Sequence, residues 1–273
     1  PNQNRAGWRA AADLSAEVTS YYTLTGYNDA DWFKITTTVP GVGIKIYLSN
    51  FDYTVPTVEA NLYTEEGTSA VWSMNFSGNG SGAYKANEAG TYYLKLNNDG
   101  NKNGSERPLR IRFELLPGDE QEFNDGWGTA FPVPYDYPVE FTLNGDNDVD
   151  WFCFETTEDG EIVTLSLTGF ETDYSNKIAY NIYNAVYDGL TGEMTGLSSS
   201  VYDGSPSITY SRQMSFATPG MHYLRIKVDG RTPVENPLTL ILQTYAAPDD
   251  QEPNNPRDLA TPLFEEEPTT FNL

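Results

Sequence analysis

The sequence is poor in the residues that most often build catalytic and metal centres. Its 273 residues include one cysteine, Cys153, and one histidine, His222. A single cysteine excludes an intramolecular disulfide framework and any zinc site that needs several thiolates. A single histidine excludes a two-histidine metal centre and leaves little scope for a serine–histidine–aspartate triad. These scarcities argue against an enzyme.

Basic residues and long apolar runs are also scarce. The chain has 16 lysines and arginines against 39 acidic residues, a formal charge of −23. Nucleic acids and anionic membrane surfaces would repel it, so we expect neither as a partner. No apolar stretch approaches the length of a membrane-spanning helix. The charge suits an exported protein or one that gathers cations, and the start at Pro1, without a signal peptide, suggests a mature or trimmed form.

What the chain does contain is an internal repeat, which decides how the sequence is read. The segment Asp31–Phe33 recurs as Asp150–Phe152, and Gly90–Leu96 recurs in related form as Gly220–Ile226. The second copy is longer between these points, and we place its additional residues within Asp188–Pro206.

A third copy begins near the end of the sequence, where Gln121–Asp125 is matched by Gln251–Asn255. We therefore expect one unit at residues 1–118, a second at 119–248, and the truncated start of a third at 249–273. So short a third segment cannot close a core of its own. The sequence is thus expected to be a fragment of a longer protein.

Within each unit the hydrophobic pattern has the period of a β-strand. Ile44, Ile46 and Leu48 alternate with polar residues, and similar runs occur at 93–96, 109–115, 163–168, 223–228 and 238–242. Turn residues such as Pro40–Gly41 and Asp159–Gly160 separate the runs. This pattern predicts an all-β chain of tandem antiparallel β-sandwiches. Ala10–Glu17 is the one segment that favours a short helix.

Aromatic residues are abundant, and most are expected in the core. In the pairs Trp32–Phe33 and Trp151–Phe152, strand alternation directs one ring of each pair inward, so core packing is favoured over ligand stacking. His222 occupies the position of Tyr92 in the first copy, which favours a sheet-face residue over a catalyst. The aromatics that could stack on a ligand at the surface are Trp72, Tyr135, Tyr137 and Tyr174.

Two motifs recur in the same order in both units, Asp29–Phe33 and Gly90–Leu96 in the first and Asp148–Phe152 and Gly220–Ile226 in the second. A third motif, Glu122–Asp125, opens the second unit and recurs as Glu252–Asn255 at the start of the third copy. In these motifs the chain resembles the bacterial pre-peptidase C-terminal (PPC) family, which includes the collagen-binding domains of clostridial collagenases. The resemblance implies jelly-roll-like β-sandwiches that are secreted, non-catalytic and attached to peptidases or other exported enzymes. Some members of that family bind collagen or polysaccharide.

The resemblance also implies a calcium site in the second unit. In collagenase-type members, acids of the linker and aspartates before the aromatic pair hold calcium together, and Ca²⁺ takes six to eight oxygen ligands. Asn147 stands where an aspartate is expected, and the alternative is a solvated acidic turn. The corresponding residues here are Glu120, Glu122, Asn124, Asp125, Asn147, Asp148 and Asp150.

We therefore expect a non-catalytic extracellular accessory or adhesion module of a larger exported bacterial protein. It would be stiffened by calcium, would bind a matrix protein or polysaccharide, and would be joined to catalytic or surface domains. One alternative is a carbohydrate-binding module that uses surface aromatics. A less favoured one is a hydrolase with a carboxylate pair such as Asp29 and Asp31, since glycosidases need two carboxyls flanking a cleft. Repetition of these acids at a strand entry in both units argues for structure or metal instead.

Overall fold

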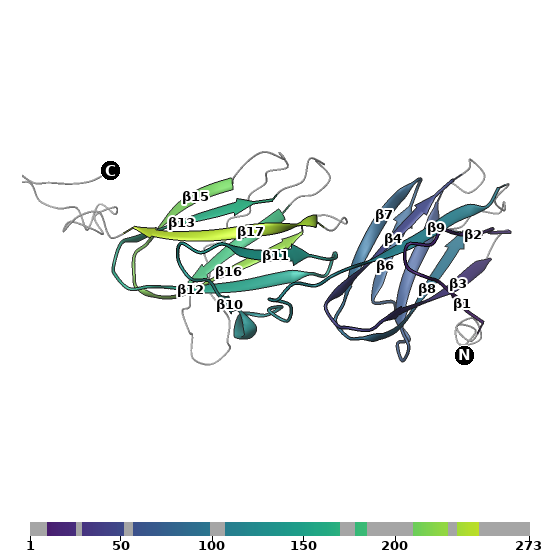
Figure 1. The fold of residues 1–273 in the computed structure, drawn as a ribbon, viewed down its shortest axis with the longest axis horizontal. Coiled ribbons are helices and arrows are strands. Elements are labelled where there is room, and N and C mark those ends of the chain that lie inside the picture. The colour runs from purple at the N-terminus through teal and green to yellow at the C-terminus, as the bar shows by residue number, and fades with distance from the viewer. Residues whose placement is uncertain are drawn as a thin grey trace, which may run out of the picture. The chain divides into compact units, whose positions relative to one another are not determined.

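The computed structural model describes residues 10–25, 29–51, 57–98, 107–169, 178–184, 210–228 and 234–245 (Figure 1). The expected insertion at Asp188–Pro206, Tyr174 and the expected third unit at 249–273 lie outside these residues. No helix of the described part is both long and apolar enough to cross a membrane.

The chain folds as two compact units. Among the described residues, the first unit contains those up to Gly118 together with the loop Asn144–Asp148 and the two residues Val234 and Glu235. The second contains Asp119–Leu143, the described residues from Val149 to Val228, and Asn236–Tyr245.

The first unit consists of a five-stranded and a four-stranded sheet. The five-stranded sheet has the order β1 (Ala12–Asp13), β3 (Ala30–Thr37), β8 (Gly90–Asn98), β5 (Val58–Thr64), β6 (Trp72–Phe76). The four-stranded sheet has the order β2 (Ser20–Tyr22), β9 (Leu109–Leu116), β4 (Val42–Ser49), β7 (Gly80–Ala86). Buried residues of both sheets form one hydrophobic cluster, so the unit is a β-sandwich.

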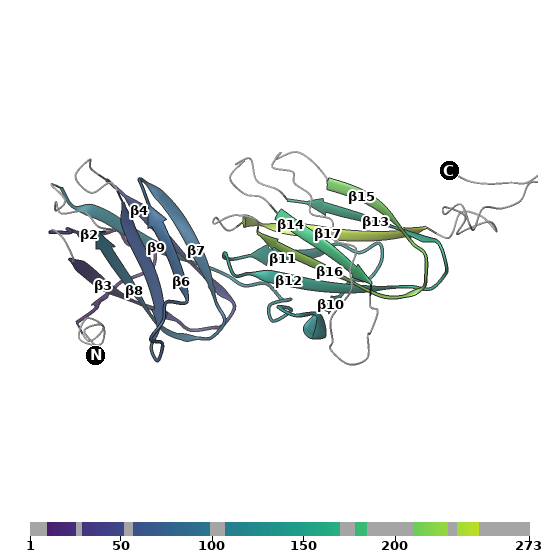
Figure 2. The ribbon, with the colours of Figure 1, turned by 180° about the vertical axis from the view of Figure 1, so that it is seen from behind.

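The second unit repeats this topology. One sheet has the order β10 (Phe131–Pro132), β12 (Val149–Thr156), β16 (Gly220–Val228), β14 (Ile178–Asn184), as Figure 2 shows from behind. The other has the order β11 (Val139–Leu143), β17 (Val234–Tyr245), β13 (Glu161–Thr168), β15 (Tyr210–Phe216). A short 3₁₀ turn, η1 (Trp127–Thr129), precedes β10. Position by position, these orders match β1-β3-β8-β5 and β2-β9-β4-β7 of the first unit.

The strand pattern of the sequence is confirmed in both units. In β4, Ile44, Ile46 and Leu48 are buried in the core, and β13 buries its alternate residues in the same way. Of the two aromatic pairs, the phenylalanines Phe33 and Phe152 face inward and are buried. Their neighbours Trp32 and Trp151 face outward and are half-buried. The all-β, tandem-sandwich prediction therefore holds, with the smaller ring of each pair in the core.

The prediction of a helix at Ala10–Glu17 is wrong. Ala12 and Asp13 form β1 and pair in parallel with Phe33 and Lys34 of β3, and the amide of Leu14 donates to the carbonyl of Lys34 at 2.9 Å. The helical preference of a few alanines is worth only tenths of a kcal/mol per residue, so pairing with the edge of β3 decides the conformation.

Candidate functional site

The segment that opens the second unit is fastened to β11 and β12. The Asp119 carboxylate accepts hydrogen bonds from the amide and the hydroxyl of Thr142 in β11, and from the amide of Gln121 at 2.8 Å. Further along, the Asn124 carbonyl accepts from the amide of Trp151 in β12 at 2.9 Å. These bonds hold the predicted linker ligands against the strand that carries Asp150.

Three of the predicted calcium ligands have buried side-chain oxygens in this region. The Asn124 side chain is 2 % exposed, and neither its oxygen nor its nitrogen has a hydrogen-bond partner among the described residues. One carboxylate oxygen of Glu122 and one of Asp150 are also buried, and Asp150 lies on the inward face of β12, ahead of Phe152. Burying an amide without a hydrogen bond costs roughly 1–3 kcal/mol, so a ligand for Asn124 would remove a real penalty.

The remaining predicted ligands lie elsewhere or are exposed. Glu120 and Asp125 are on the same segment but face solvent. Asn147 and Asp148 belong to the loop that groups with the first unit, and both contact Lys85 of β7. The Lys85 ammonium and the Asp148 carboxylate are 2.8 Å apart and both are buried. The Asn147 side-chain oxygen accepts from the Lys85 amide at 2.8 Å, and its nitrogen donates to the Lys85 carbonyl at 3.0 Å.

No three His, Cys, Asp or Glu side chains within the described ranges converge in an arrangement that could hold a metal ion. A site around Asn124 would therefore draw on an amide oxygen and two carboxylates, with backbone oxygens or water completing the shell. Such a ligand set suits calcium, which accepts neutral oxygens, better than it suits a transition metal.

Asp31 of the first unit corresponds to Asp150. It faces inward on β3, ahead of Phe33, and burial followed by the nearby charge of Asp29 raises its pKa to about 6. Asp29 itself closes a turn, since its carboxylate accepts from the amide of Thr25 at 2.6 Å and from its hydroxyl at 2.9 Å. Asp31 also lines a cavity of about 500 Å³ with Tyr22. The elevated pKa of Asp31 therefore has a structural cause, burial beside a like charge.

His222 and Cys153 both have structural surroundings, in which burial sets their contacts and their pKa shifts. His222 is buried between Phe154 and Phe216, with ring centroids 5.3 and 4.0 Å away, and its Nε2 lies 2.8 Å from the Thr156 hydroxyl. Burial lowers the pKa of His222 to about 4. Cys153 is half-buried, and burial raises the pKa of its thiol, which makes a thiolate nucleophile less accessible.

The outer face of the β12–β16–β14 sheet carries an aromatic cluster. Trp151 stacks on Tyr183 with centroids 5.4 Å apart and planes inclined by 26°, and the Arg225 guanidinium lies 5.9 Å from the Trp151 ring. Trp127 meets Tyr223 edge-on at 6.1 Å. The sequence analysis did not single out Trp127 or Tyr183. The alternation of the strand does place Trp151 outward, and that was the available signal for an aromatic outer face on this sheet.

Among the aromatics predicted at the surface, the prediction for Trp72 is wrong. Its ring is buried in the hydrophobic core of the first unit, and its Nε1 donates to the carboxylate of Asp146 at 3.1 Å. Tyr135 is half-buried and donates to the carbonyl of Glu155 at 2.9 Å. Tyr137 is 68 % exposed.

Comparisons with known proteins give distant likenesses only. No protein-family model and no curated protein matches the chain. Tripeptidyl peptidase 2 matches with a TM-score of 0.33 and 6 % identity over 86 % of this chain, which spans 24 % of the peptidase. The tandem CBM22 domains of Xyn10C from Paenibacillus barcinonensis match with a TM-score of 0.27 and 9 % identity, covering 85 % of this chain and 92 % of theirs. The CUB1-EGF-CUB2 domain of human MASP-1/3 matches with a TM-score of 0.22 and 9 % identity, covering 83 % and 99 %. Scores this low leave the function to be argued from the chain's own residues.

Proposed function

We propose that the chain is a non-catalytic accessory or adhesion module of an exported bacterial protein, in which calcium fixes the segment Asp119–Asp125 on the second sandwich. The observation that carries the proposal is the Asn124 side chain, buried without a hydrogen-bond partner beside the strand position of Asp150. The PPC-like motifs of the sequence support the same assignment.

The chemistry of the site favours weak calcium binding. Glu122 and Asp150 would supply two negative charges and Asn124 a neutral oxygen, which is a lower charge than tight intracellular calcium sites use. Sites of this kind suit the 10⁻⁴–10⁻³ M affinities of extracellular modules, because calcium is plentiful outside the cell. The site is therefore one that would fill after export.

Thermal unfolding of the full chain in millimolar calcium and in chelator tests this proposal. Millimolar calcium is about one to ten times such a Kd and stabilises the folded state by about 0.4–1.4 kcal/mol, so calcium should raise the Tm by a few degrees. Asn124→Ala and Asp150→Asn should abolish the response. Glu155→Gln is the matched control, since Glu155 is an exposed acid of the same strand.

A further variant separates a metal site from a solvated turn. Asn124→Asp would add a buried negative charge, so it should lower the Tm in chelator and enlarge the gain on adding calcium. In a solvated turn, the same change would be indifferent to calcium. Equal melting curves in calcium and in chelator for the native chain would refute the site.

The absence of catalysis is tested separately, by assays on peptide and glycan substrates. We expect no turnover. Turnover that is lost when one carboxylate such as Asp31 is replaced, in a variant that still folds, would establish the hydrolase alternative instead.

Polysaccharide recognition is the second candidate, favoured by the aromatic cluster on the outer face of the second unit. Flat rings such as Trp151 and Tyr183 stack on the apolar faces of sugars, and Arg225 adds a donor beside them. Tyr183→Ala should weaken retention on immobilised polysaccharide without changing the calcium response. Retention on collagen instead would identify a matrix protein as the ligand.

A further inference from the structure

The outer face of the first unit's four-stranded sheet carries two adjacent rows of polar and aromatic side chains. Tyr21 of β2 pairs with Arg110 of β9, and Arg110 pairs with Ser49 of β4. In the next outward row, Arg112 of β9 pairs with Tyr47 of β4, which pairs with Ser81 of β7. The intervening residues of β9 and β4 are buried in the core, so these side chains project outward.

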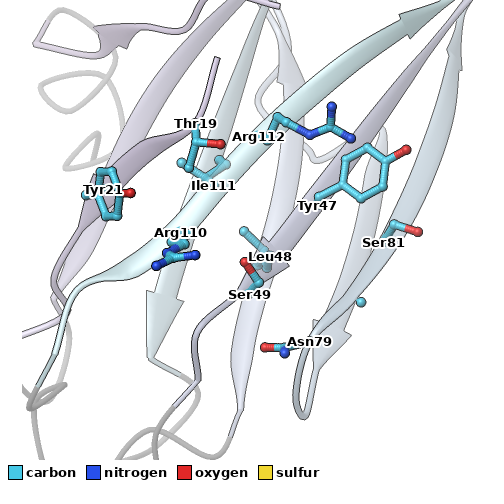
Figure 3. A pocket seen from close by; sticks show the side chains of 11 residues that line it. Thr19, Tyr21, Tyr47, Leu48, Ser49, Asn79, Ser81, Arg110, Ile111 and Arg112 are labelled. Atoms are coloured by element: carbon cyan, nitrogen blue, oxygen red, sulfur yellow. The ribbon is translucent and has the colours of Figure 1, made fainter. Parts of the chain in front are cut away.

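The two rows line a cavity of about 530 Å³ (Figure 3). Thr19 and Asn79 complete its polar lining, and its volume is in the range of small-ligand sites. Leu48 and Ile111 also border it, but their side chains are buried in the core, so the surface offered to a ligand is polar and aromatic.

Each arginine lies against a tyrosine ring. The Arg110 guanidinium is 5.7 Å from the centroid of Tyr21, and that of Arg112 is 4.5 Å from the centroid of Tyr47. Arg112 is held in place by ion pairs with Glu17, at 2.8 Å, and with Glu114. The Tyr47 hydroxyl donates to Glu114 at 2.6 Å, so this half of the cavity is fixed before any ligand arrives.

Arg110 is the group that this network leaves for a ligand. Its side chain is exposed, and it has no ion pair with any carboxylate of the described residues, although the chain has 39 acidic side chains. Tyr21 beside it is 63 % exposed. The chain's charge of −23 opposes the approach of an anion, but exposed charges more than about 10 Å away are largely screened at physiological salt. An exposed cation next to a flat ring therefore marks a local site for an anionic group on a planar or ring-shaped body.

We propose that this cavity binds a polysaccharide that carries carboxylate groups, of the polyuronate type. Arg110 would take the sugar carboxylate in a two-point hydrogen bond, which guanidinium geometry favours. Tyr21 and Tyr47 would lie against the sugar rings, and Thr19, Ser49, Asn79 and Ser81 would bond their hydroxyls. Short hydroxyl and amide side chains around the cavity suit sugars better than acidic peptides, because a sugar ring offers several hydroxyls to bond, whereas acidic side chains offer only carboxylates.

The site is separate from the two parts of the proposed function and fails separately. It lies on the first unit, whereas the calcium residues and the aromatic cluster of Trp151 lie on the second. Variants of the calcium residues or of the Trp151 cluster should therefore leave binding at this cavity unchanged. The experiment must compare an anionic with a neutral glycan on the same protein.

Isothermal titration or affinity electrophoresis of the full chain with polygalacturonate provides that test. Dextran serves as the neutral glycan and polyglutamate as the acidic peptide. At about 0.1 M salt, where long-range repulsion by the chain's net charge is largely screened, we expect polygalacturonate to bind, and dextran and polyglutamate to show no binding that depends on Arg110. Arg110→Gln should weaken polygalacturonate binding at least tenfold, the order expected for a charged hydrogen bond, and Arg110→Lys should keep part of it. Tyr21→Ala should also weaken binding. Neither this variant nor Arg110→Gln should change the Tm, because the side chains of Tyr21 and Arg110 are both exposed.

One control keeps the result specific. Lys95→Gln removes one positive charge from the other sheet of the first unit and should bind polygalacturonate as the native chain does. Arg225→Gln shows whether the aromatic cluster of the second unit holds the polysaccharide instead. The proposal is overturned if polygalacturonate does not bind, if polyglutamate binds equally well, or if Arg225→Gln rather than Arg110→Gln abolishes binding.

Discussion

Phe152→Ala should lower the free energy of unfolding more than Trp151→Ala does, although tryptophan is the larger side chain. Phe152 is 0 % exposed and meets Phe141 edge-on with ring centroids 5.1 Å apart. Removing such a ring leaves a core cavity, so Phe152→Ala should lower the free energy of unfolding by about 3–5 kcal/mol. Trp151 is larger but half-buried on the outer face, where its main contact is the stack on Tyr183. Trp151→Ala should therefore cost about 1–2 kcal/mol, the sum of a partial burial and an aromatic pair.

Urea unfolding followed by far-ultraviolet circular dichroism measures both values without relying on the tryptophan signal that one variant removes. The internal repeat supplies an independent replicate, since Phe33 is buried against Tyr22 while Trp32 faces outward. Phe33→Ala should likewise cost more than Trp32→Ala. A Trp151→Ala variant that loses as much stability as Phe152→Ala would show that the outer face is packed as tightly as the core, and would refute the orientation argument.

The remaining predictions concern buried charges. Asp148→Ala should cost about 3–5 kcal/mol by leaving the Lys85 ammonium buried without its carboxylate, and adding Lys85→Met should recover most of that loss in the same urea experiment. The pKa of Asp31 lies at about 6, above its ordinary 3.8, so the folded state holds the proton more tightly and the first unit should lose stability as the pH rises from about 4 to 6. Asp31→Asn should flatten that part of the stability–pH curve. The pKa of His222 is shifted the other way, from 6.5 to about 4, so the second unit should lose stability as the pH falls through that interval, and His222→Phe should remove this loss.

The sequence predicted the fold well because strand alternation and the internal repeat are properties of neighbouring residues. The burial of Ile44, Ile46 and Leu48 follows directly from their spacing. The segment Ala10–Glu17 shows the limit of such reasoning, since the pairing of Ala12 with Phe33 depends on residues distant in the sequence. The helix propensity of a segment depends on its own residues and carries no information about a distant partner such as Phe33.

The candidate sites were only partly accessible from the sequence. Glu122, Asn124 and Asp150 could be singled out by the motifs they belong to, but the burial of the Asn124 amide needed the structure. Asp148 looked like a ligand for a cation, and the structure gives it the ammonium of Lys85 instead. No spacing rule connects residues so far apart in the chain. The pairing of Tyr21 with Arg110 could not be predicted from the sequence for the same reason, because it depends on which strands are neighbours in the sheet.

The contact between Asn147 and Lys85 has a consequence for how the protein behaves at high concentration. β7 is an edge strand of its sheet, and an edge with open amides and carbonyls is a template on which another chain can add a strand. Asn147 occupies both the amide and the carbonyl of Lys85, and the Asp146 amide occupies the carbonyl of Ala83 at 3.2 Å. The loop thus covers the Ala83–Lys85 part of this edge with two side-chain hydrogen bonds and one from the backbone, which hinders the addition of a strand from another chain there.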